Sequence, residues 1–270
     1  MPELPEIRNL ARQMNRALRH LEVQAAEVRQ PKCLNMPVAR FRRLVEGKTV
    51  ASAASRGKWI FVRLEPAAWL LVSLGMGGDL FYHRAGQPVP EIYQVRLAFA
   101  GGSSLTARFW WFGYVHAVTD ADAAGHGMTA ALGLNPLSKR EFTYERFDEL
   151  VGSRNAAIKP FLLDQKRIAG IGNVYVQDIL FRAGLHPSRR IARISPEERR
   201  ALHAAIVAQL QQATALGGLR YEKDLFQRSG RFEKFQVGYR EGRPCPACGT
   251  TIQKVRTGST ASYICPSCQT

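Results

Sequence analysis

Residues 168–187 read IAGIGNVYVQDILFRAGLHP, and this stretch decides how the second half of the chain folds. Gly170 and Gly172 flank Ile171 immediately before a run of helical spacing that starts at Asn173. A glycine turn that leads into a helix exposes backbone N–H groups and the positive end of the helix dipole, which together bind phosphate. A tight turn between packed helices explains the same residues. A Rossmann dinucleotide site is excluded, because no strand precedes the glycines and the third glycine is absent.

Helical spacing continues on both sides of this stretch. It is present in FDELVGS (147–153), in FLLDQ (161–165) and in PEERRALHAAIVAQLQQATAL (196–216). The sequence therefore predicts a helical domain that begins near residue 140, after a break at LGLNPLS, and ends near residue 218. A polar connector rich in Arg and Gly follows, from residue 220 to residue 243.

The first half of the chain has a different period. Residues 4–19 carry apolar side chains at helical spacing, with Pro5 near the first turn and acidic residues at the start, which predicts one amphipathic helix. From residue 21 to residue 118 the period changes towards two, as in KWIFVRLE and WLLVSL. Short strands joined by turns predict an antiparallel sandwich or a barrel-like sheet.

Four of the five cysteines lie in the last 26 residues as CPAC and CPSC. Two C-x2-C pairs separated by sixteen residues suit a closed tetrahedral thiolate site, which predicts one structural Zn²⁺. A rubredoxin-like iron centre is the alternative. The residues between the pairs predict a hairpin that the metal holds together, and Cys33 is interpreted as a plain thiol. The predicted ligands are Cys245, Cys248, Cys265 and Cys268.

The charge of the chain points to a polyanionic partner. The 270 residues contain 38 Lys and Arg against 22 Asp and Glu, a formal net charge of +16. Nucleic acid is the leading candidate, because neutralising phosphates releases counterions; a solvated basic surface is the alternative. No apolar run approaches the length of a membrane span and no signal peptide is evident, so we expect a monomeric protein of the bacterial cytoplasm and nucleoid with no membrane partner.

The first six residues, MPELPE, carry the chemistry that the sequence suggests. Removal of the initiator Met is expected to leave Pro2 with a free secondary amine, whose neutral fraction at pH 7 is roughly a few hundred times that of a lysine. Its attack on a sugar C1′ gives an iminium that favours base loss and strand elimination, and Glu3 can move the protons, with Glu6 one turn further along. The alternative is that these residues only start a helix.

Taken together, these motifs resemble the formamidopyrimidine-DNA glycosylase and endonuclease VIII family of base-excision repair enzymes, as a divergent member. The resemblance runs from end to end. It rests on MPELPE, SRGKWI, SLGMGGDL, the FG at residues 112–113, LGLNPLS, KPFLLDQKRIAGIGNVYVQDILFRAGLHP and the terminal CPAC and CPSCQ.

The resemblance implies an α+β fold in three parts. These are an N-terminal helix with an antiparallel β-sandwich (1–140), a helix-two-turn-helix domain (141–240) and a zinc finger with four cysteine ligands (241–270). It also implies a bifunctional glycosylase and abasic-site lyase that binds damaged double-stranded DNA, with single-stranded or abasic DNA as further partners.

The resemblance also assigns roles to single residues. Pro2 becomes the Schiff-base nucleophile and Glu3 the general acid. Lys58, Lys159 and Asn173 become phosphate contacts, Lys58 beside the lesion. Met76 fills the space that a flipped nucleotide leaves, and Phe112 belongs to the same DNA-contacting FG motif.

Two positions depart from the family pattern. Thr260 stands where the tip of the finger usually has an arginine, and a hydroxyl lacks the charge and the fork of a guanidinium. Arg256, on the opposite strand of the hairpin, is a candidate to replace it. Trp110 stands where the oxidised-purine enzymes have an arginine that reads the opposite base, so weak opposite-base discrimination is expected. The short connector after residue 220 also argues against 8-oxoguanine paired with cytosine as the main substrate.

Two other functions compete with the enzyme. A non-catalytic damaged-DNA recognition protein of the same fold would retain the basic surface, but the joint presence of Pro2, Glu3 and Lys58 argues against it. An RNA-binding zinc-ribbon protein fits the charge and the cysteines, but leaves MPELPE unexplained.

Overall fold

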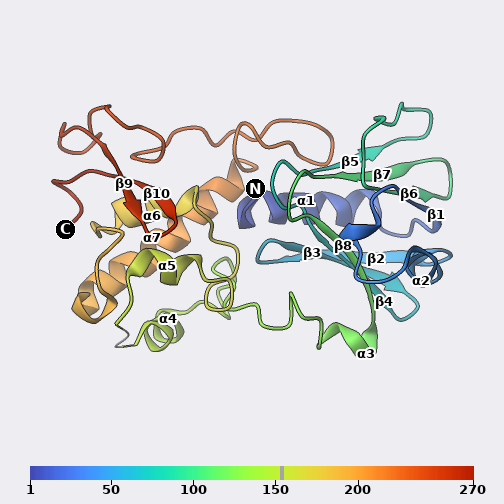
Figure 1. Ribbon diagram of the computed structural model, residues 1–270, viewed down its shortest axis with the longest axis horizontal. Helices are drawn as coiled ribbons and strands as arrows, with labels where there is room; N and C mark the ends of the chain where they lie inside the picture. The colour runs from blue at the N-terminus through green and yellow to red at the C-terminus, as the bar shows by residue number, and fades with distance from the viewer. Residues whose placement is uncertain (153–154) are drawn as a thin grey trace. The chain divides into compact units, whose positions relative to one another are not determined.

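The computed structural model describes residues 1–152 and 155–270 (Figure 1). The chain forms two compact units, one of residues 1–131 and 216–232, the other of residues 132–215 and 233–270. The division into 1–140, 141–240 and 241–270 stays a prediction. That prediction did not anticipate that residues 216–232 return to the first unit.

The first unit begins with the predicted helix, α1 (Leu4–Ala17). Pro5 lies in its first turn, where a missing N–H costs nothing. The apolar side chains at positions 7, 10 and 14 are buried in the core. A short 3-10 helix, η1 (Pro31–Cys33), and a second helix, α2 (Val38–Val45), were not predicted, because they interrupt the region of short strands.

Two antiparallel four-stranded sheets form the rest of this unit, which confirms the predicted sandwich. One sheet has the order β1-β6-β7-β5 and the other β2-β3-β4-β8. A short helix, α3 (Asp120–Ala123), follows the last strand. The strands are β1 (Val23–Val28), β2 (Thr49–Arg56), β3 (Trp59–Glu65), β4 (Ala68–Ser73), β5 (Asp79–His83), β6 (Val95–Phe99), β7 (Ser104–Arg108) and β8 (Tyr114–Thr119).

The core of this unit joins the helix to both sheets. Leu10 and Met14 of α1 belong to the same buried cluster as Val62 of β3 and Leu97 of β6. Helix α1, which starts two residues after Pro2, is therefore fixed by apolar packing along its length.

The second unit is helical where the sequence predicted it. Its helices are α4 (Tyr144–Val151), α5 (Ile158–Leu163), α6 (Tyr175–Arg182) and α7 (Pro196–Ala215), with a 3-10 helix η2 (Ile191–Arg193). The helical pattern 147–153 extends to a residue outside the described range. Across the residues that the structure describes, no helix has the length and apolar character needed to cross a membrane.

The C-terminal residues form the predicted hairpin, with β9 (Gln253–Thr257) and β10 (Thr260–Ile264) antiparallel. Thr260 pairs with Thr257 at the turn, so it lies at the tip of the hairpin as predicted. Arg256 pairs with Ala261, which places it on the opposite strand.

Candidate functional site

The N-terminal residues are held by a buried carboxylate. Glu3 and Glu6 form a capping box at the start of α1, and both side chains are almost fully buried. One oxygen of Glu6 accepts the Glu3 N–H at 2.8 Å, and the other accepts the Leu219 N–H at 3.0 Å. Glu6 therefore joins the start of α1 to the returning segment 216–232, which we call the strap.

The strap is tied to the same face of α1 further along. The Gln13 amide donates to Asp224 at 2.8 Å, and its oxygen accepts the Leu225 N–H at 2.9 Å. On the other side, the Tyr82 N–H of β5 donates to the Leu225 carbonyl at 2.9 Å. Because Glu6 and Gln13 lie two turns apart on one helix, they fix the direction of the strap as well as its position.

A glycine is required where the strap passes Glu6. Gly218 has a φ of +91°, and a Cβ there would lie 2.6 Å from the Glu6 carboxylate. Gly217 also has a positive φ, +75°, but a Cβ there meets its nearest heavy atom, of the Asn9 amide, only at 3.7 Å. Gly218 is therefore needed both for its backbone conformation and for its missing side chain.

The predicted catalytic residues lie together in the first unit. The Lys58 ammonium is 4.0 Å from the sulfur of Met1, and Lys58 follows the Gly57 turn between β2 and β3. Pro2 is buried and adjoins the buried Glu3, whereas Met1 is 45% exposed. Met1 is thus an exposed residue that directly precedes a buried proline.

Sequence reasoning missed one carboxylate at this site. The amine of Met1 lies 3.7 Å from Glu222 of the strap, whose side chain is 15% exposed. Burial raises the pKa of the Glu222 carboxyl above its usual value, and Asp79 and Glu3 raise it further, against the opposing effect of the N-terminal charge. No local pattern could have indicated Glu222, because the contact depends on the return of the strap.

A cavity of about 750 Å³ is lined by the two strap residues on either side of Glu222. The strap contributes Tyr221 and Lys223 to its lining, and the sheet contributes Asp79 and Arg108, which form an ion pair. Its other walls include Phe81, Pro88, Val89, Pro90 and Ile92. The cavity therefore combines an apolar wall with several polar groups, as ligand sites do.

Two loops of the first unit present a group of exposed apolar side chains. The Met76 N–H donates to the Trp111 carbonyl at 2.8 Å, and the Trp110 N–H donates to the Met76 carbonyl at 3.0 Å. Their exposed fractions are 48% for Met76, 73% for Trp110, 64% for Trp111 and 67% for Phe112. Such a patch marks a binding surface. The structure brings the three predicted residues together and adds Trp111, which sequence reasoning missed although it lies between Trp110 and Phe112.

Gly75 allows these two loops to meet. It has a φ of +54°, and a Cβ there would lie 2.1 Å from the Trp111 carbonyl oxygen. The glycine next to Met76 therefore permits a close backbone approach that no side chain would tolerate.

In the second unit, Asn173 lies two residues before α6 and is half-buried. Gln177 donates to its backbone carbonyl at 2.8 Å and to its side-chain oxygen at 3.2 Å. With its oxygen held in this way, the Asn173 amide nitrogen can donate to a phosphate.

Lys159 requires a correction. Its side chain is 1% exposed, and its ammonium donates to the Ala261 carbonyl at 2.6 Å and to the Ser262 hydroxyl at 2.8 Å. Burial lowers the pKa of Lys159 to about 8. The predicted phosphate contact does not fit this position, because the ammonium is already used to attach the finger hairpin to α5.

The tip of the finger hairpin is polar and basic. Arg256 is exposed, and its guanidinium donates to the Gly258 carbonyl at 3.2 Å. Thr260 is half-buried and lines, with Arg256 and Lys254, a groove of about 370 Å³. The candidate replacement cation and the threonine therefore border one groove.

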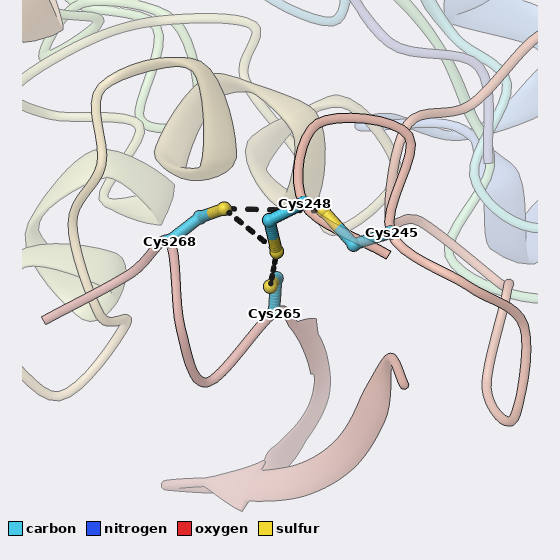
Figure 2. Close-up of side chains that lie close together, drawn as sticks. All are labelled: Cys245, Cys248, Cys265 and Cys268. Carbon is cyan, nitrogen blue, oxygen red and sulfur yellow. Dashed lines mark hydrogen bonds between the residues drawn. The ribbon is translucent and has the colours of Figure 1, made fainter. Parts of the chain in front are cut away.

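The four C-terminal cysteines form a metal site (Figure 2). Their sulfur atoms all lie within 4.8 Å of one another, and Cys248 lies 3.4 Å from both Cys265 and Cys268, sulfur to sulfur. Tetrahedral Zn²⁺ with Zn–S bonds of about 2.3 Å requires S···S separations of about 3.8 Å, so the residues fit the ion. Hydrogen bonding to Thr250 lowers the pKa of Cys248, whereas burial raises that of Cys265 and the hydrogen bond with Cys248 raises that of Cys268.

The arrangement matches known proteins along the whole chain. Residues 1–109 match the formamidopyrimidine-DNA glycosylase N-terminal domain, residues 132–223 its H2TH domain, and residues 242–270 the zinc finger found in FPG and IleRS. The chain belongs to the formamidopyrimidine-DNA glycosylase family. This confirms the resemblance, and with the cysteine cluster it assigns one structural zinc.

Several members of the family are similar over their full length. The formamidopyrimidine-DNA glycosylase of Gluconobacter oxydans is 37% identical over 100% of both chains. That of Bacillus subtilis is 32% identical over 100% of this chain and 99% of its own.

Solved structures of a member of the family have the same fold. Lactococcus lactis Fpg in complex with DNA containing N7-benzyl-Fapy-dG has a TM-score of 0.92 and 25% identity over 99% of each chain. The same enzyme with abasic-site DNA has a TM-score of 0.91 at the same identity and coverage. The predicted fold class is confirmed.

Proposed function

We propose that this chain is a bifunctional DNA glycosylase and abasic-site lyase that acts on damaged double-stranded DNA. Family membership over the whole chain supports the activity. The observation that carries the assignment to this site is the grouping of Pro2, Glu3 and Lys58 at the buried start of α1. The zinc ion is structural, because four thiolates leave no open position for substrate.

Chemistry in this proposal starts after removal of Met1. The neutral Pro2 nitrogen bonds to C1′ of the damaged nucleotide, the glycosidic bond breaks, and its electron pair leaves with the base. Glu3 supplies the proton that opens the sugar ring, which gives an iminium between Pro2 and C1′. In β-elimination a C2′ proton passes to water, its electron pair forms a double bond conjugated with the iminium, and the 3′ phosphate leaves; δ-elimination then releases the 5′ phosphate, and Lys58 holds these phosphates.

DNA contacts in this proposal come from both units. In the first unit Met76, Trp110, Trp111 and Phe112 supply apolar surface that enters the base stack when the lesion is extruded. In the second unit Asn173 and Arg256 donate to phosphates. Lys159 contributes by supporting the hairpin that carries Arg256.

The proposed lesions are ring-opened purines, hydantoins, oxidised pyrimidines and bulkier adducts. The cavity beside the strap, at about 750 Å³, lies in the range of sites for drug-sized ligands and suits a base with a substituent. The Lactococcus lactis enzyme was solved with DNA that contains N7-benzyl-Fapy-dG. We infer that 8-oxoguanine opposite cytosine is not the main substrate, because Trp110 cannot read cytosine as an arginine does.

Borohydride trapping tests the proposal. Wild-type protein, shown by mass spectrometry to start at Pro2, is expected to give a covalent adduct with abasic duplex DNA. Pro2→Gly should weaken or abolish the adduct, whereas the matched control Pro5→Ala retains the amine and should still give it. Absence of a wild-type adduct, under conditions where a bacterial relative gives one, would overturn the enzyme assignment and favour a non-catalytic DNA-binding protein.

A location in the bacterial cytoplasm, with the nucleoid, belongs to the same proposal, and the bacterial sources of the relatives support it. The monomeric state stays a prediction. Size-exclusion chromatography with light scattering, with and without duplex DNA, measures it directly.

A further inference from the structure

A carboxylate of the strap reaches the N-terminal nitrogen. One oxygen of Glu222 lies 3.7 Å from the Met1 amine, and its side chain is 15% exposed. The charged groups that face it are Glu3 of α1 and Asp79 of β5, together with the terminal amine. Asp79 is itself paired with Arg108 of β7. Glu222 thus occupies a largely enclosed position beside the amine of Met1, the residue that precedes the proposed nucleophile.

Backbone hydrogen bonds fix Glu222 from both sides. Its N–H donates to the Leu219 carbonyl at 3.1 Å, and its carbonyl accepts the Gly230 N–H at 3.2 Å. Leu219 is in turn bonded to Glu6 of α1. Helix α1 therefore also determines where the Glu222 carboxylate lies, because its residue Glu6 holds both the N-terminal residues and the strap.

Schiff-base formation requires a proton acceptor at the nitrogen. When the neutral secondary amine of Pro2 bonds to C1′, the nitrogen carries a positive charge and keeps its proton. That proton must leave before the nitrogen lone pair can form the iminium and release the ring oxygen. Glu3, as the proposed acid, holds a proton at this stage and cannot accept another. A second proton acceptor is therefore needed.

We propose that Glu222 is the base that accepts the N–H proton of Pro2 during Schiff-base formation. The N–H bond breaks, its electron pair returns to nitrogen, and the proton passes to a Glu222 oxygen. This inference rests on the proposed function. Removal of Met1 moves the terminal nitrogen by one residue, a Cα spacing of about 3.8 Å, which is a distance that one water can bridge between this nitrogen and Glu222.

The test is the rate of adduct formation measured from pH 5.5 to pH 9.5 on abasic duplex DNA under single-turnover conditions. Glu222→Gln retains the shape of the side chain but cannot accept the proton, and Glu91→Gln is the matched control at an exposed loop position. All proteins are first shown to start at Pro2, to contain zinc and to unfold cooperatively.

A base role predicts a lower plateau. At high pH the amine is already neutral, yet its proton must still leave after attack, so we expect the plateau rate of Glu222→Gln to fall roughly 100-fold. A purely electrostatic role predicts instead a midpoint that moves to lower pH with an unchanged plateau, because loss of the carboxylate removes a charge that stabilises the ammonium. An unchanged plateau would overturn the proposal.

Chemical rescue gives a second readout. Glu222→Ala leaves space for a small carboxylic acid, so added formate should increase its adduct rate in proportion to concentration, with no effect on Glu91→Gln. Absence of rescue in a folded, DNA-binding variant would contradict the base role. If the wild-type protein forms no adduct, the proposed function fails. If the wild-type protein forms the adduct and the Glu222 variants form it at the same rate, only this inference fails.

Discussion

Substituting the two adjacent glycines of the strap one at a time distinguishes the effect of backbone strain from the effect of a steric clash with Glu6. Gly217 and Gly218 both have positive φ values, +75° and +91°, so Ala imposes a left-handed strain of about 1–2 kcal/mol at either position. Only at Gly218 does the new Cβ collide with Glu6, at 2.6 Å from a carboxylate oxygen. The contacting atom is the end of a flexible side chain, so we expect Glu6 to move aside rather than the backbone to open.

The cost then appears in the hydrogen bonds of Glu6. Movement of this carboxylate leaves the buried Leu219 N–H without its acceptor, at a cost of about 1–3 kcal/mol. Since 1.4 kcal/mol corresponds to a factor of ten, Gly218→Ala should speed exchange of the Leu219 amide hydrogen roughly 5- to 150-fold beyond Gly217→Ala.

Native-state hydrogen exchange resolved at Leu219 measures this difference, and borohydride trapping measures its consequence. Trapping should slow more in Gly218→Ala than in Gly217→Ala, because the strap also carries Glu222. Equal exchange rates at Leu219 in the two variants would refute the reasoning, since strain alone would then explain both.

Three further predictions concern other parts of the chain. Lys159→Met removes two hydrogen bonds to the finger hairpin, so this variant should release zinc to a chelating dye faster than the control Lys254→Met, whose lysine is exposed. Equal rates of release would mean that the hairpin does not depend on Lys159. Thr260→Arg adds a phosphate contact, so strand cleavage should rise and the salt dependence of binding should steepen by about one ion; no change would mean that Arg256 already serves. Burial lowers the pKa of His116 from an ordinary value of 6.5 to about 4, and its ring lies 2.8 Å from that of His126. Neutral His116 therefore adds about 3 kcal/mol to the free energy of unfolding above pH 6.5, and this stabilisation is lost as the pH falls towards 4. Denaturant unfolding at pH 7.5 and pH 4.5 checks this, and a pH dependence that His116→Leu leaves unchanged would contradict it.

Much of the fold could be predicted because its signals are local. The spacing of apolar residues in α1, the alternation in β3 and the C-x2-C pairs each lie within one short stretch of sequence. The secondary structure of residues in such patterns depends on their neighbours in the sequence, so it can be predicted from the sequence alone. The proposed roles of Pro2 and Glu3 came from the residues themselves, whereas that of Lys58 required the resemblance, because Lys58 is distant from the N-terminus along the chain.

The strap and Lys159 could not be predicted, because both depend on distant partners. Leu219 bonds to Glu6 across 213 residues of sequence, and a polar, glycine-rich segment gives no local sign of such a contact. A lysine in a basic chain is usually exposed, so the burial of Lys159 against residues 261 and 262 contradicts the ordinary expectation. In each case a buried polar group found its partner in the tertiary structure rather than in its own segment.

The exposed aromatic loop bears on how this enzyme would choose its substrates. The ring of Trp110 lies close over Gly77, and the side chain is 73% exposed. An indole carries a single donor and no acceptor, so it cannot present the paired donors that an arginine offers to the edge of a base. It can, however, stack on any base, which contributes binding energy without regard to identity. Discrimination between lesions then depends on the extrusion of the nucleotide from the base stack, because a damaged or mismatched nucleotide costs less free energy to extrude than an intact one. Such a surface is therefore expected to favour lesions that weaken stacking over lesions recognised by their partner strand.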